Sequence, residues 1–316
     1  MEKTLNIYQG KSKSGLRKAM VQKQSNSRQN TRKTEKLIEQ LLVLCAAIFI
    51  VAIILITLFI FAKGIPLLLK VGLSDFLMNS DWRPSKGVFG IWTMFVGSMA
   101  VTFSSMLWAV PLGITTAIFM AEVAPRRIGK MLGSLVELLA GIPSVVYGFI
   151  GLIVIVPVIR DHLGGNGLSV LAGAIILGIM ILPTIINISR DSIMAVPKEY
   201  KEGSLALGAT HYQTIARVIV PAARSGIITA IVLGMGRAIG ETMAVVMVTG
   251  NSTVVPNGIL SPVRTMTSNI VLEMGYAAGD HQQALFATGM VLFVFIVCLN
   301  LMVSISAKAG RTNGGI

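Results

Sequence analysis

Two opposite charges stand four positions apart inside an apolar stretch of the chain, at Arg237 and Glu241. In a continuous helix this spacing puts both side chains on one face. Arg237 follows Ile227, where the stretch begins, by ten residues, or about 15 Å of helix, which places it near the centre of a bilayer. A charge in hydrocarbon costs several kcal/mol, so we expect both residues to face a protein interior or a water-filled path.

These two residues support two interpretations. In the first, Arg237 binds an anion that crosses the membrane and Glu241 holds the arginine when the site is empty, since a guanidinium suits tetrahedral oxyanions. In the second, Arg237 and Glu241 form a structural ion pair. The sequence has neither a metal-spaced cluster of ligands nor a Ser/His/Asp or paired-carboxylate arrangement at membrane depth. We therefore expect no enzyme activity, no metal and no cofactor.

The elements that must position this pair are transmembrane helices. Hydrophobic residues make up 53% of the 316 positions and charged residues only 13%, about half the usual share for a soluble domain. The apolar residues form runs of about 20 or more, and at that length only helices span a bilayer. The sequence predicts an all-α membrane protein with about six transmembrane helices, at Leu41–Ala62, Ile91–Met120, Met131–Val158, Leu168–Ile188, Ile227–Thr249 and Ala284–Ile305.

The net charge of +13 is concentrated at one end of the chain, where ten of the 27 Lys and Arg residues precede Glu39. Residues 1–38 are basic and polar, so we expect a disordered tail in the cytoplasm that touches anionic lipid. No recognition fold accompanies it, which argues against nucleic-acid binding. The predicted loops on the tail's side hold ten further basic residues against five on the other side, which favours both termini in the cytoplasm. The first apolar run is too long for a cleavable signal peptide and should remain as an anchor.

A polar loop from Glu199 to Arg224 lies between the fourth and fifth predicted spans. It follows Pro197, where a helix can begin, and Gly208 should divide it into two short helices. Glu202, Gly208 six positions on and Pro221 thirteen beyond that have the spacing of the "EAA" loop found in permease subunits of ATP-binding-cassette importers. The two residues after Glu202 are Gly and Ser instead of the two alanines of that motif. The resemblance implies a coupling helix that docks on a separate ATPase subunit.

The chain itself lacks the means to bind ATP. A phosphate-binding loop needs Gly, four residues and then Gly-Lys-Ser or Gly-Lys-Thr. The Gly10-Lys11-Ser12 run has Leu5 where the first Gly belongs and lies in the basic tail, so we interpret it as chance. Cys45 and Cys298 both fall inside apolar runs and should behave as small apolar residues.

The segment around Arg237 and Glu241, Gly-Arg-Ala-Ile-Gly-Glu-Thr-Met-Ala, resembles the fifth span of the phosphate-specific permease family of the PstC type. The resemblance covers about residues 88–306, and other stretches that agree with it are Gly90-Ile-Trp92, Ala109-Val-Pro-Leu-Gly113, Met120-Ala-Glu-Val-Ala-Pro125 and Leu135-Val-Glu-Leu-Leu-Ala-Gly-Ile-Pro-Ser-Val-Val-Tyr-Gly148. It implies a second permease subunit, two ATPase subunits, an external phosphate-binding protein and passage of phosphate by Arg237 and Glu241.

These features predict four regions. Residues 1–38 form the tail, 39–90 the first transmembrane helix with an outer connection, 91–306 a permease core with the coupling loop at 197–224, and 307–316 a short cytoplasmic tail. The expected function is that of a permease subunit of an ATP-driven phosphate importer in the inner membrane, with type I importer architecture. The alternatives are a permease for phosphonate, sulfate or molybdate, a secondary anion transporter, and a membrane enzyme or sensor. The EAA-type loop argues against the secondary transporter, and the missing catalytic constellation argues against the enzyme.

Overall fold

A computed structural model describes the backbone of residues 2–312 and the side chains of residues 36 and 38–301. The chain forms two compact units, Met1–Phe59 and Ile60–Ile316. The first unit belongs to helix α1 (Glu2–Val71), which continues into the second. Its apolar side chains between Ile38 and Phe59 are exposed all round, and a helix of this kind buries its surface in lipid or against other helices.

The backbone of residues 2–38 is helical, where the sequence predicts disorder in water. The chain has no proline before Pro66, and Lys, Arg, Gln and Glu are good helix formers, so the helix can extend through this segment in spite of Gly10 and Gly15. The side chains of residues 1–35 lie outside the described residues. The boundary of the tail at residue 38 and the tail's contact with lipid stay predictions.

The second unit opens with a small layer at one end of the helices. It consists of α2 (Leu73–Met78) and an antiparallel ribbon of β1 (Trp82–Arg83) and β2 (Val88–Phe89), joined by a single 3-10 turn, η1 (Pro84–Lys86). A hydrophobic cluster lies beneath it and includes Leu67, Phe76, Trp82, Phe89, Ile91, Met94, Met266 and Leu285. The cluster thus joins this layer to the first turns of α3 and to two helices near the C-terminus.

Helices α3 (Trp92–Ile118) and α7 (Val170–Met194) pack closely at the centre of the unit. The ring of Trp108 lies over Gly178, where any side chain would clash, and its indole donates to the Ala174 carbonyl at 3.3 Å. Small residues at helix contacts are typical of membrane proteins because they let backbones approach. Helix α3 ends in a π-helical turn, η2 (Phe119–Val123).

The third predicted span is wrong in its extent. Residues 126–141 form a separate helix, α4 (Arg126–Gly141), and the chain then breaks at Ile142 and Pro143. Pro143 disfavours helical backbone in the residue before it, and Ile142 is extended with ψ 127°. The span begins after this break and runs through α5 (Ser144–Ile150), the π-turn η3 (Gly151–Ile155) and α6 (Val156–Leu163).

The fifth predicted span, Ile227–Thr249, is broken within its length, and the chain bends just before it. A helical segment, α9 (His211–Thr214), η4 (Ile215–Ile219) and α10 (Val220–Ala222), meets α11 (Arg224–Gly240) at 67°. Helix α11 then stops, and the short α12 (Met243–Val248) follows. After a long connection come α13 (Met266–Glu273) and α14 (Asp280–Thr312).

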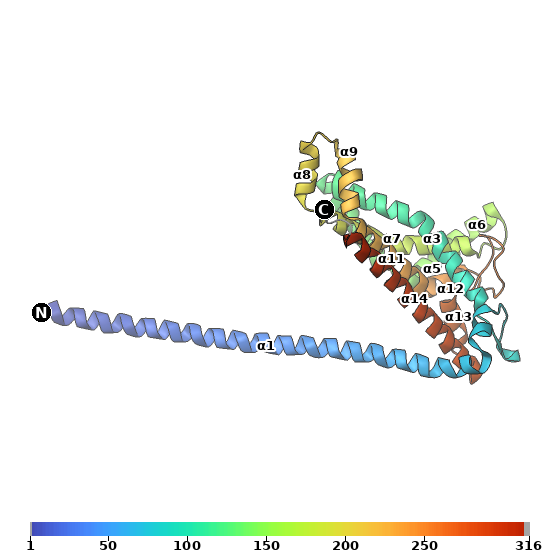
Figure 1. Cartoon of the computed structure of the whole chain (residues 1–316), viewed down its shortest axis with the longest axis horizontal. Helices are drawn as coiled ribbons and strands as arrows, with labels where there is room; N and C mark the ends of the chain where they lie inside the picture. Colours follow the sequence, from blue (N-terminus) through green and yellow to red (C-terminus); the bar gives the residue numbers. More distant parts are fainter. Residues whose placement is uncertain (1, 313–316) are drawn as a thin grey trace. The chain divides into compact units, whose positions relative to one another are not determined.

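The prediction of about six spans in an all-α protein is confirmed. In the described part of the chain five helices are long and apolar enough to cross a membrane, and the bent segment ending in α11 makes a sixth. Within the second unit α8 (Lys198–Ala206) and α9 project together at one end, while α13 lies at the opposite end (Figure 1). The coupling loop and the α13 region therefore face opposite sides of the helices.

Candidate functional site

The break between α11 and α12 separates Arg237 from Glu241. Glu241 follows the last residue of α11 and is extended, with φ −68° and ψ 136°, so the prediction that both side chains share one face of a continuous helix is wrong. Gly240 and Thr242 flank the break, and neither favours a helix interior. Among the described residues no ion pair joins Arg237 to Glu241. Each charge is held by a different partner.

Arg237 lies in the last turn of α11 with an exposed side chain. Its Nη1 donates to the hydroxyl of Thr184 on α7 at 3.1 Å. The guanidinium is also within electrostatic range of the Tyr147 hydroxyl on α5, which donates to the Leu139 carbonyl at 2.8 Å across the break at Pro143. Arg237 is thus positioned where α5, α7 and α11 come together.

Glu241 holds the break together. Its Oε1 accepts a hydrogen bond from the Ala244 amide at 3.3 Å, in the first turn of α12. Its backbone carbonyl, left without a helix partner by the break, accepts from the Thr267 hydroxyl of α13 at 2.9 Å. A small cavity of about 10 Å³ adjoins Glu241, Ser98 and Thr102. This volume suits about one water molecule and is too small for a tetrahedral oxyanion.

Helix ends stabilise both charges. The C-terminal end of a helix carries partial negative charge and its N-terminal end partial positive charge. Arg237 stands near the C-terminal end of α11, and the Glu241 carboxylate stands at the N-terminal end of α12. Broken membrane helices of this kind line substrate and ion paths in transporters, because the backbone groups that they expose need a polar surrounding.

The coupling loop folds as a hairpin of two short helices divided at Gly208, as the sequence predicts. Gly208 has φ +85°, and its amide donates to the Leu205 carbonyl at 2.9 Å to end α8. Thr210 and Gln213 then form a capping box that starts α9. Glu202 is exposed on α8, and Pro221 lies in α10, immediately before the 67° bend. The three residues of the motif therefore belong to one helical hairpin and the helical segment that leaves it. They do not converge on a single site.

The hairpin exposes large apolar side chains that no described residue covers. Leu207 is 90% exposed and Tyr212 is 78% exposed, and Tyr200 and Leu205 extend this surface. Exposed apolar groups that lie together on a surface are typical of sites of contact with other proteins.

Sequence reasoning gave no role to Glu122, which ties the hairpin to the membrane helices. Glu122 lies in the π-turn that ends α3, and its side chain is 11% exposed. Its carboxylate accepts from Lys201 Nζ of α8 at 2.6 Å, and His211 Nε2 of α9 lies 4.0 Å away. The sequence signal is an acidic residue at the end of an apolar span, in front of a polar loop rich in basic residues.

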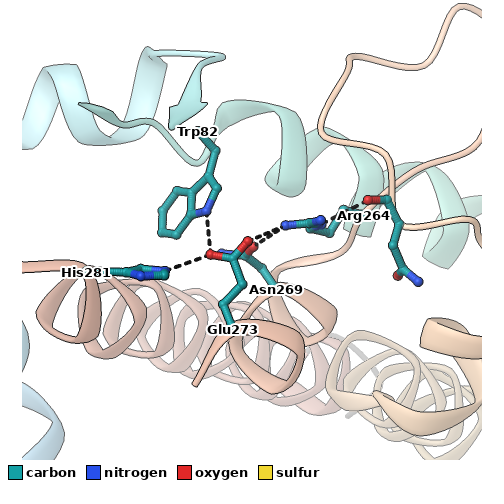
Figure 2. A network of polar contacts seen from close by, with 6 residues as sticks. Trp82, Arg264, Asn269, Glu273 and His281 are labelled. Carbon is teal, nitrogen blue, oxygen red and sulfur yellow. Dashed lines mark hydrogen bonds and ion pairs between the residues drawn. The ribbon is translucent and has the colours of Figure 1, made fainter. Parts of the chain in front are cut away.

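A second group that sequence reasoning missed lies around Glu273, at the end of α13. Figure 2 shows Arg264, Trp82 and His281 pointing at its carboxylate from three sides. The sequence pattern indicates no site at Arg264 or His281. Arg264 and His281 lie nine and eight residues from Glu273, but Trp82 lies 191 residues away and the spacing of the other three matches no known motif, so the sequence did not reveal the group.

The comparisons with known proteins agree with this architecture. Residues 109–311 match the family model of the binding-protein-dependent transport system inner membrane component. The chain is 45% identical over 290 residues to the probable ABC transporter permease protein YqgH of Bacillus subtilis, covering 88% of this chain and 94% of that one. It is 35% identical over 262 residues to the phosphate transport system permease protein PstC of Xylella fastidiosa, covering 75% and 81%. A probable PstC of Methanocaldococcus jannaschii is 33% identical over 281 residues, covering 81% and 89%.

Two solved structures share the fold. A bacterial ABC transporter involved in the import of alginate matches with a TM-score of 0.57 at 15% identity, over 84% of this chain and 95% of that chain. The MetNI methionine ABC transporter matches with a TM-score of 0.54 at 17% identity, over 70% and 94%. The fold is that of a type I ABC importer permease, a multi-pass membrane protein. The chain belongs to the inner membrane components of binding-protein-dependent transport systems and, among them, to the PstC-type permeases.

Proposed function

We propose that this chain is one of two permease subunits of an ATP-driven phosphate importer, and that Arg237 binds phosphate as it crosses the membrane. The observation that carries the proposal is the exposed guanidinium of Arg237 at the break of a membrane helix, held by the neutral hydroxyl of Thr184. A neutral partner leaves the guanidinium without a counter-ion, and a planar array of N–H donors suits a tetrahedral oxyanion. The names of the PstC relatives point to phosphate as that anion.

Glu241 has a supporting role in this proposal. A carboxylate beside the path repels phosphate unless its own charge is satisfied. The Ala244 amide and the N-terminal end of α12 supply that compensation. Glu241 thereby fixes the first turn of α12 next to the break. Arg237 alone attracts the anion. This replaces the picture in which Glu241 pairs with Arg237 when the site is empty.

The remaining parts of the importer follow from the same proposal. The α8–α9 hairpin, with Glu202 and Gly208 and with Pro221 at its exit, would dock on one of two ATPase subunits in the cytoplasm. The opposite end, with α13, would face an external phosphate-binding protein, and both termini would be cytoplasmic. A second permease subunit would complete the path and would cover Arg237. This explains why Arg237 is exposed when the subunit is considered without its partner. The subunit would perform no chemistry and would need no cofactor.

The proposal is tested by uptake of labelled phosphate in cells that lack other high-affinity phosphate import. The chain is expressed with its neighbouring transport genes, and Arg237→Gln is compared with Arg160→Gln, which removes an exposed arginine paired with Asp161, at matched membrane levels. Uptake that collapses only in Arg237→Gln and resists excess sulfate and molybdate supports the proposal. If excess sulfate or molybdate abolishes the uptake of labelled phosphate, the transported substrate is that other oxyanion. Equal uptake in both variants would give Arg237 a structural role.

A further inference from the structure

The carboxylate of Glu273 is the point where four separate segments meet. Its Oε1 accepts from Arg264 Nη1 at 2.6 Å, and its Oε2 accepts from Trp82 Nε1 at 2.8 Å. His281 Nε2 lies 2.8 Å from the same Oε2. Trp82 belongs to β1, Arg264 to the connection before α13, Glu273 to the end of α13 and His281 to the first turn of α14, as Figure 2 shows.

Glu273 is buried with both carboxylate oxygens hydrogen-bonded, and His281 and Arg264 are partly buried. The side chain of Glu273 is 9% exposed, that of His281 15% and that of Arg264 17%. Arg264 is fixed further, because its Nε donates to the Asn251 carbonyl at 3.0 Å and its Nη1 to Asn269 Oδ1 at 3.0 Å. A buried carboxylate with several donors is rigid, and removal of its charge leaves a buried arginine without compensation. The group therefore fixes the end of α13 with little freedom.

The other end of α13 touches the break at Glu241. Thr267 donates its hydroxyl to the Glu241 carbonyl at 2.9 Å, and the Met266 amide donates to Ser98 Oγ of α3 at 3.0 Å. Helix α13 spans only Met266–Glu273, so Thr267 and Glu273 belong to one short rigid element. A displacement of Glu273 consequently moves the hydroxyl that holds the break.

We propose that Glu273 is a positioning residue for transport, which acts through α13 on the break at Glu241 and so on Arg237. The expected effect of Glu273 on phosphate uptake rests on the proposed function. The expected effect of Glu273 on the conformation of the break at Glu241 does not. Glu273 touches neither Arg237 nor the break itself. Its effect is carried by Thr267, and loss of either residue releases the same contact.

The first experiment follows the break directly and needs no transported substrate. In a chain whose Cys45 and Cys298 are replaced by Ser, Gly240→Cys supplies a reporter at the break, where an added Cβ meets nothing within 4 Å. The rate of maleimide labelling at residue 240 is measured in the assembled transporter. It is compared between the reporter chain with Glu273 intact and the same chain carrying Glu273→Gln or Asp280→Asn. Asp280 is the matched control, because it is an exposed carboxylate in the first turn of α14 that pairs with Lys70. We expect Glu273→Gln to change the labelling rate by about threefold or more and Asp280→Asn to leave it unchanged.

A double-mutant cycle then tests the route through Thr267. Thr267→Val and Glu273→Gln should each lower phosphate uptake by between about threefold and thirtyfold, and together should lower it little more than either alone. Thr288→Val, which removes a buried hydroxyl bonded within α14, should combine additively with Glu273→Gln. Unchanged labelling at residue 240, or full additivity of Thr267→Val with Glu273→Gln, would overturn the inference. Absence of phosphate uptake in the parent chain would instead refute the proposed function and leave the labelling result standing.

Discussion

Arg237 of α11 donates a hydrogen bond to Thr184 of α7 at 3.1 Å, where these two helices pack together. Thr184 is half-buried and directly follows Pro183, which interrupts the hydrogen-bond ladder of α7. The guanidinium is therefore held by a side chain on a locally irregular helix. Because the hydroxyl carries no charge, it orients Arg237 without neutralising it.

This relationship predicts that Thr184 sets the affinity for the transported anion. Thr184→Val keeps the volume and removes the hydroxyl, so Arg237 loses its fixed orientation. A hydrogen bond to a charged group contributes about 1.5–3 kcal/mol, and we expect the concentration for half-maximal phosphate uptake to rise by about tenfold or more. Thr184→Ser retains the hydroxyl and should remain close to the parent chain. The measurement is the concentration dependence of phosphate uptake at matched membrane levels. Equal values for the Val and Ser variants would contradict the prediction that the Thr184 hydroxyl sets the affinity.

Phosphate uptake should depend less on the negative charge of Glu241 than on its side-chain oxygen that accepts a hydrogen bond. Its carboxylate accepts from the Ala244 amide at 3.3 Å, and the amide oxygen of Gln can accept the same bond. We expect Glu241→Gln to keep most of the phosphate uptake and Glu241→Leu to lose it, because only the second leaves the first turn of α12 without a cap. The measurement is initial uptake rate. A Gln variant as inactive as the Leu variant would show that the negative charge itself is required.

The sequence predicted the class of fold well because that signal is carried by composition. Runs of about 20 apolar residues between polar loops can form only membrane helices, so their number followed directly. The hairpin at Gly208 was also predictable, since a glycine between two short amphiphilic segments is a local signal. Arg237 was identified as a candidate site residue for a similar reason, because an arginine inside an apolar run is conspicuous in sequence.

The arrangement around those charges could not be predicted. The spacing of Arg237 and Glu241 assumes one continuous helix, and the break at Gly240 is stabilised by Thr267, which comes 26 residues after Glu241. The same limit hid the convergence on Glu273, where Trp82 arrives from a position 191 residues away. Such contacts depend on the tertiary fold, whereas sequence spacing reports only neighbours along one element.

Glu122 should link movement of the hairpin to the membrane helices. Its partly buried carboxylate accepts from Lys201 of α8 at 2.6 Å and lies at the end of α3, which packs along α7. We expect Glu122→Gln to leave the ATPase subunits bound and active but to lower the amount of phosphate moved per ATP hydrolysed by about threefold or more. The readout is this ratio in sealed vesicles. The exchange of Glu122→Lys with Lys201→Glu should restore part of it, and an unchanged ratio in Glu122→Gln would contradict the link.

Gly208 should be required for assembly with the ATPase, while the neighbouring Gly203 should not. Gly208 has φ +85°, a conformation that costs about 1–2 kcal/mol for residues with a Cβ, although the surrounding space is open. Gly203 lies inside α8, also with open space around an added Cβ, where Ala should stabilise the helix by about 0.5–1 kcal/mol. We expect Gly208→Ala to redirect Leu207 and the start of α9 and so to weaken copurification of the ATPase severalfold. Gly203→Ala should retain or strengthen it. Equal retention of the ATPase by both variants would show that the left-handed turn at Gly208 does not determine how the hairpin docks.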